Sequence, residues 1–86
     1  MCSYETTQTP LVGSAKRESG WTGIGSANIY YACPYHSALE DAVNIDFIVR
    51  DRPRERIALE LSPESALALA RAILATLARE VHEHAP

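Results

Sequence analysis

The last third of the chain carries one amphipathic helical pattern, and this pattern limits the possible folds more than any other feature. Ser62, Pro63 and Glu64 match an N-cap, a first helical position and an acidic first turn. Apolar residues then recur at intervals of three and four, at Ala66, Leu67, Ala70, Ile73, Leu74, Leu77 and Val81. The spacing predicts a helix of about five turns that frays at residues 82–84. Its apolar face requires another element to pack against.

Three segments before this helix alternate in the manner of β-strands, at residues 27–33, 43–50 and 56–61. A turn over residues 51–54 joins the last two as a hairpin. Residues 3–12 alternate loosely and predict one edge strand or two short ones. The inward positions expected are Ile29, Tyr31 and Cys33 in the first segment, Val43, Ile45, Phe47 and Val49 in the second, and Ile57, Leu59 and Leu61 in the third.

All four glycines lie within residues 13–26, which show neither a helical nor a strand period. We therefore expect a loop there, anchored by Trp21. Its Gly13-Ser14-Ala15-Lys16 sequence matches the end of a phosphate-binding P-loop only superficially, because the glycine spacing and the following helix are missing. Trp21 and three tyrosines (Tyr30, Tyr31 and Tyr35) could line an aromatic pocket, although in so small a chain such rings are more often core or interface anchors.

These elements predict an α+β fold, in which a small antiparallel sheet of three to five strands packs one face on the C-terminal amphipathic helix. The 86 residues suffice for one domain, residues 1–86. One helix covers one face of the sheet, and the opposite face is half apolar, with Tyr30, Ala32, Ile48 and Ala58. We therefore expect a homodimer or a larger homo-oligomer.

The composition of 47% hydrophobic and 22% charged residues predicts a folded, soluble protein, and no apolar run reaches the ~18 residues of a membrane span. The net charge is −3, and the one basic cluster, formed by four arginines within residues 50–56, is interleaved with acidic residues. This favours a solvated turn with local ion pairs over an anion site, and it argues against nucleic acid as a partner. Two cysteines and the lack of a signal-peptide pattern favour the cytoplasm.

Residues with potential chemistry gather between the first two predicted strands. The spacing of Cys33 and His36 allows both to bind one metal ion, with Glu40 or Asp41 as a third ligand. Pro34 ends ladder pairing after Cys33 and lets the chain turn back. Zinc suits this mixed set best, with copper and iron as the alternatives. The simpler interpretation is a buried thiol, a hydrogen-bonded histidine and a solvated acidic turn.

Cys2 is a further candidate ligand, if the first strand runs beside the second. Removal of Met1 would leave an N-terminal cysteine, whose thiolate and amine could chelate a metal or act as nucleophile and base. The alternative is a half-buried thiol on an edge strand.

Several short motifs resemble a family of short actinobacterial proteins that is known only as a domain of unknown function. They are the Met-Cys-Ser-Tyr start, Gly-Ser-Ala-Lys, Pro34-Tyr35-His36 with Glu40, Asn44-Ile45-Asp46-Phe47, and the start of the terminal helix. The resemblance covers nearly the whole chain and implies no activity. The family pattern has histidine where this chain has Cys33 and Asp41. Such an exchange of one metal ligand for another raises the expectation of a metal site.

Three function classes follow from these observations. The first is a metal-binding homo-oligomer with a role in actinobacterial biosynthesis. It is either an accessory protein there or acts on a small molecule. The second is a metal-free enzyme or small-molecule binding protein, with His36 and Glu40 as a catalytic acid/base pair and Asn44 and Asp46 orienting the ligand. The third is a non-catalytic oligomeric interaction module. The sequence leaves open whether the protein is an enzyme.

Overall fold

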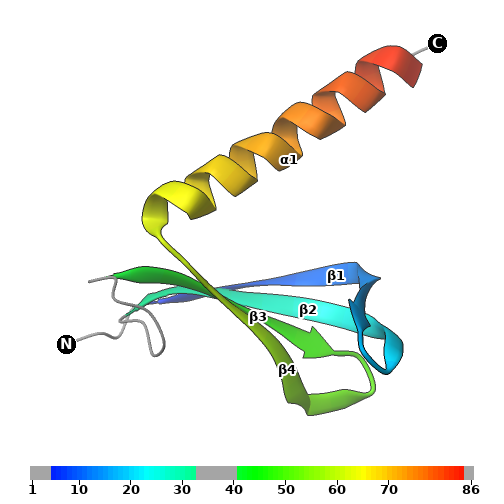
Figure 1. Cartoon of the computed structure of the whole chain (residues 1–86), viewed down its shortest axis with the longest axis vertical. Coiled ribbons are helices and arrows are strands. Elements are labelled where there is room, and N and C mark those ends of the chain that lie inside the picture. Colours follow the sequence, from blue (N-terminus) through cyan, green and yellow to red (C-terminus); the bar gives the residue numbers. More distant parts are fainter. Residues whose placement is uncertain (1–4, 33–40, 85–86) are drawn as a thin grey trace.

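The computed structural model describes residues 5–32 and 41–84, with side chains up to Glu80. Four strands form one antiparallel sheet in the order β1-β2-β3-β4, and a helix follows (Figure 1). The elements are β1 (Thr6–Arg17), β2 (Gly20–Ala32), β3 (Ala42–Val49), β4 (Arg52–Leu61) and α1 (Pro63–His84). The prediction of an α+β fold with an antiparallel sheet and one C-terminal helix is confirmed.

The prediction of a glycine-rich loop over residues 13–26 is wrong, because most of this segment belongs to the long hairpin of β1 and β2. Lys16 pairs with Trp21 and Arg17 with Gly20, so the connecting turn contains only Glu18 and Ser19. The register shifts between Pro10 and Gly13 on β1 and between Ile24 and Ser26 on β2. Bulges of this kind interrupt the alternation of side chains and accommodate glycine within strands, which hides the strands from a search for period two.

The hairpin of β3 and β4 is present, but its turn lies earlier than predicted. Val49 pairs with Arg52, so Arg50 and Asp51 form the turn and β4 already contains Pro53. Proline has no N–H to donate to a ladder, and β4 tolerates it because this strand lies at the edge of the sheet. The arginines within residues 52–56 therefore extend along an edge strand instead of a loop.

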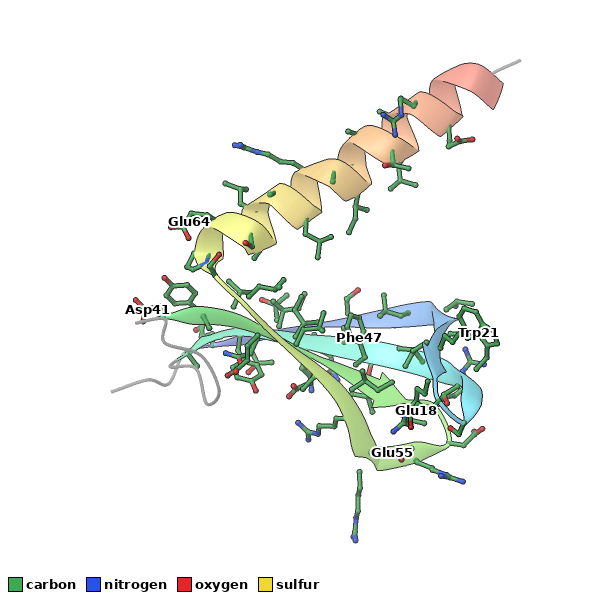
Figure 2. The ribbon with its side chains drawn as sticks, viewed as in Figure 1. Glu18, Trp21, Asp41, Phe47, Glu55 and Glu64 are labelled. Carbon is green, nitrogen blue, oxygen red and sulfur yellow. The ribbon has the colours of Figure 1, made fainter. Side chains whose placement is uncertain are left out.

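The sheet has one apolar face, as the alternation in β3 and β4 predicts. Cross-strand partners on this face are Val43 with Leu61, Ile45 with Leu59, and Phe47 with Ile57. Figure 2 shows Phe47 on the side of the sheet over which α1 extends. The opposite face carries polar partners, among them Tyr30 with Asn44 and Asn28 with Asp46.

The start of α1 agrees with the capping prediction. The Ser62 hydroxyl accepts a hydrogen bond of 3.1 Å from the Ser65 N–H, and the Ala66 N–H donates to the Ser62 carbonyl over 2.9 Å. The helix packs against the sheet through β3 and β4. Pro63 and Ala66 are half-buried, whereas every residue from Leu67 to Glu80 is exposed. The helix therefore covers the apolar face at its first turn and then extends away from it (Figure 1).

Candidate functional site

Most of the predicted metal and acid/base residues lie outside the described part of the chain. These residues are Cys2, Cys33, His36 and Glu40. Asp41 is described and lies half-buried, immediately before β3. Within residues 5–32 and 41–84, no three His, Cys, Asp or Glu side chains come together as a metal site would require. The proposed ligand set therefore remains a prediction.

Asn44 and Asp46, which we expected to orient a ligand, are buried on the polar face of β3. Their exposed fractions are 5% and 7%. One oxygen of the Asp46 carboxylate accepts a hydrogen bond from the Tyr30 hydroxyl at 3.3 Å and lies 3.2 Å from Nη1 of Arg56. These contacts connect β2, β3 and β4. The two partners compensate the free-energy cost of burying the Asp46 carboxylate.

Asn44 lies beside this group, and its side-chain amide donates to the Ala42 carbonyl on the same strand at 3.5 Å. No buried side-chain nitrogen or oxygen in the described ranges lacks a hydrogen-bond partner. Asp46 and Asn44 are thus satisfied within the chain. The described residues of this face therefore form a polar network that connects strands of the sheet.

The β3 side chains on the apolar face of the sheet are less buried than those on the polar face. In β3 the buried residues Ala42, Asn44 and Asp46 face the polar network, whereas the intervening Val43, Ile45 and Phe47 are only half-buried. Figure 1 shows α1 diverging from the sheet above this face. We call these two apolar surfaces together the apolar wedge; it consists of Val43, Ile45, Phe47, Ile57, Leu59 and Leu61 of the sheet and Leu67, Ile73, Leu74 and Leu77 of α1.

The helical side of the wedge is strongly exposed, with 51% of Leu67, 52% of Ile73, 66% of Leu74 and 56% of Leu77 accessible to solvent. Neighbouring apolar side chains that are exposed to this degree are typical of protein–protein, membrane and ligand contact surfaces. Sequence analysis identified the helical stripe correctly. It could not show that the sheet of the same chain leaves this stripe uncovered.

A second feature lies at the end of the sheet away from the start of α1, where the β1–β2 and β3–β4 turns meet. A hollow of about 330 Å³ opens there, between Arg17, Trp21, Arg52 and Glu55. Figure 2 shows Glu18, Trp21 and Glu55 together at this end. The guanidinium groups of Arg17 and Arg52 lie 3.3 and 3.9 Å from the same carboxylate oxygen of Glu55. Sequence analysis anticipated ion pairs in the arginine cluster but not the partnership with β1.

Comparison with known proteins agrees with the resemblance noted in the sequence. The chain belongs to DUF6295, a family of unknown function whose model matches residues 1–86. No curated protein and no solved structure matches the chain. No helix in the described part has the length and apolar character that a membrane span requires. The function must therefore be inferred from the surfaces of the molecule itself.

Proposed function

We propose that this protein is a homo-oligomeric interaction module in which two copies fill each other's apolar wedge. The observation that carries the proposal is the exposure of the α1 stripe above a half-buried apolar sheet face. In the assembled form, the two α1 helices would lie between the two sheets, so that both apolar surfaces of each copy lose contact with water. This arrangement completes a core that one chain leaves open.

The size of the exposed surface supports a partner of this kind. A compact protein of 9.4 kDa exposes roughly 5,000 Å² by the usual scaling with mass. This chain exposes 6874 Å², which exceeds that value by about 1,900 Å². Its radius of gyration is 15.0 Å, against about 12 Å for a compact domain of this length. A standard interface buries about 800 Å² per partner, which is less than this excess.

The chemistry of the wedge favours a second copy as the occupant. A two-fold interface brings the same patch of both subunits together and must be self-complementary. The helical stripe and the sheet surface are both apolar, and neither includes a charged residue. Two such surfaces therefore match each other without a buried, unpaired charge.

The test is the mass of the protein in solution, measured by light scattering at micromolar concentration. The wild-type protein should have at least twice the 9.4 kDa mass of one chain. Leu74→Glu places a charge on the stripe and should give the mass of one chain, whereas Ala75→Glu, on the other side of α1, should leave the mass unchanged. A wild-type mass of 9.4 kDa would refute the proposal.

A metal site at the end of the sheet where α1 begins is a second candidate function, supported by the pairing of Ala32 with Ala42. Because of this pairing, the segment that contains Cys33, His36 and Glu40 leaves and re-enters the sheet at neighbouring positions. Asp41 stands at the point of re-entry. We propose that Cys33, His36 and one carboxylate of the Glu40/Asp41 pair bind zinc, with Cys2 as a further ligand and with copper and iron as the alternative metals. Elemental analysis of protein purified without chelator tests this site.

Involvement in small-molecule metabolism is a narrower hypothesis within the same proposal. In the metal-free version, His36 and Glu40 form an acid/base pair that acts on a bound small molecule. Asn44 and Asp46 form hydrogen bonds within the chain, so in this version they would stabilise the sheet and would not contact the ligand. Native mass spectrometry of the purified protein would reveal a retained small molecule.

A further inference from the structure

The hollow at the turn end of the sheet has the size and the surroundings of a small ligand site. Its volume of about 330 Å³ lies at the lower end of the range for ligand pockets, about 300–1,000 Å³. The residues that line it come from β1, β2, the β3–β4 turn and β4. It lies at the far end of the sheet from Leu61, where α1 begins, and none of the residues that define the apolar wedge lines it.

Positive charge is concentrated at this end of the molecule. Residues 16–18 and 50–55 contain five of the eight basic residues of the chain and three acidic ones, whereas the whole chain has a net charge of −3. This asymmetry arises because the β1–β2 turn and the arginine-rich β3–β4 hairpin reach the same end of the sheet. An anion would be attracted to this end and repelled by the rest of the chain.

Two guanidinium groups already define a place for an anionic group. Nη1 of Arg17 and Nη1 of Arg52 approach the same oxygen of Glu55, at 3.3 and 3.9 Å. Arg52 is held loosely, since its side chain is 76% exposed and its distance lies at the limit of an ion pair. A guanidinium group has five N–H donors in a planar fork, so contact with one oxygen leaves donors for a second, bidentate acceptor.

Trp21 supplies an aromatic surface beside these arginines. Although it lines the hollow, it is 69% exposed, and Nζ of Lys16 lies 5.6 Å from the centroid of its ring. Ion pairs in a solvated turn would explain the positions of Arg17, Arg52 and Glu55. The contact with Lys16 explains why Trp21 lies next to them, and it leaves most of the tryptophan surface accessible to a ligand.

We propose that this hollow binds a small aromatic anion. Its carboxylate or phosphate group would be held by Arg17 and Arg52, and its ring would stack on Trp21. The carboxylate of Glu55 occupies the place of the anionic group when no ligand is bound, so it competes with the ligand. Replacing Glu55 by a neutral residue should therefore strengthen binding of the anion. Replacing Arg52 by a neutral residue should weaken it.

The test uses Trp21 as a fluorescent reporter, because the full-length chain has no other tryptophan. The protein is titrated up to about 10 mM, well above a millimolar Kd, with benzoate, phenyl phosphate and neutral benzamide. Both anions should change the fluorescence in a saturable manner, and benzamide should not. The anion that binds more tightly identifies the preferred group. Failure of both anions to give a saturable change, or equal binding of benzamide, would overturn the proposal.

Three variants distinguish a ligand site from general attraction to a basic surface. Arg52→Gln should weaken binding about tenfold, the effect of one hydrogen bond to a charged group. Arg54→Gln removes the same charge from β4 outside the hollow and should change binding less than about twofold. Glu55→Gln should tighten binding severalfold. Equal losses in the two arginine variants, or weaker binding in Glu55→Gln, would contradict the site.

Discussion

Nη1 of Arg56 on β4 lies 3.2 Å from Oδ2 of Asp46 on β3, and the Tyr30 hydroxyl of β2 donates to the same oxygen. The Asp46 side chain is 10% exposed, whereas that of Arg56 is 53% exposed. An edge-strand arginine thus neutralises a carboxylate in the middle of the polar face. The contact links three strands through one buried oxygen, so its loss should affect the sheet as a whole.

Arg56→Met should lower the free energy of unfolding by about 1–2 kcal/mol, because Asp46 stays buried and keeps Tyr30 as its partner. Denaturant titration measures this change. Arg54→Met is the matched control on the same strand and should alter stability by less than about 0.5 kcal/mol. Equal effects of the two substitutions would show that the contact with Asp46 does not stabilise the fold.

Gly20→Ala should lower the free energy of unfolding by about 1 kcal/mol or more, since Gly20 has φ +114 and alanine disfavours this conformation. Gly13→Ala serves as the control, because Gly13 lacks a positive φ and a Cβ at this position meets no atom within 4 Å. Denaturant titration compares the two variants. A Gly13→Ala variant as unstable as Gly20→Ala would count against a conformational cause.

Ser62→Ala should reduce stability by about 1 kcal/mol, because it removes the hydroxyl that accepts the Ser65 N–H at the start of α1. The control is Ser65→Ala, which keeps this N–H donor and the Ser62 acceptor. Thermal unfolding followed by circular dichroism at 222 nm reports on the helix. An unchanged unfolding curve for Ser62→Ala would mean that the cap contributes nothing in the intact protein.

The unfolding temperature of the wild-type protein should rise with protein concentration, because association stabilises the folded chain by mass action. Leu74→Glu should abolish this dependence, and Ala75→Glu should keep it. Calorimetry over a wide range of concentrations tests the prediction. A concentration-independent transition in the wild-type protein would argue against the wedge as an interface between copies.

Protein purified without chelator should carry stoichiometric zinc, and both Cys33→Ser and His36→Ala should lose it, because each removes a proposed ligand. The double substitution of His82 and His84 by alanine is the control. These residues end α1, so their loss should change stability by no more than about 1 kcal/mol and leave the metal content intact. Loss of zinc in this control, with His36 present, would contradict the assignment of His36.

Short-range patterns allowed the ends and faces of several elements to be predicted. The N-cap of α1 depends on hydrogen bonds among Ser62, Ser65 and Ala66, which are close in sequence. The apolar face of β3 and β4 follows from the alternation over residues 43–47 and 57–61, which the register of Phe47 with Ile57 confirms. These features depend on neighbouring residues, so the order of amino acids suffices to specify them.

The long hairpin of β1 and β2 and the surfaces around it depended instead on the tertiary structure. The bulges near Gly13 and Gly25 break the alternation, and only pairing with the neighbouring strand reveals that the segment is extended. The convergence of Arg17 and Arg52 on Glu55 likewise requires two separate turns to meet at one end of the sheet. The sequence by itself determined which helix face is apolar. Whether the sheet of the same chain covers that face depends on the direction in which α1 leaves β4, and this direction involves contacts between the first turn of the helix and strands β3 and β4, which no local pattern encodes.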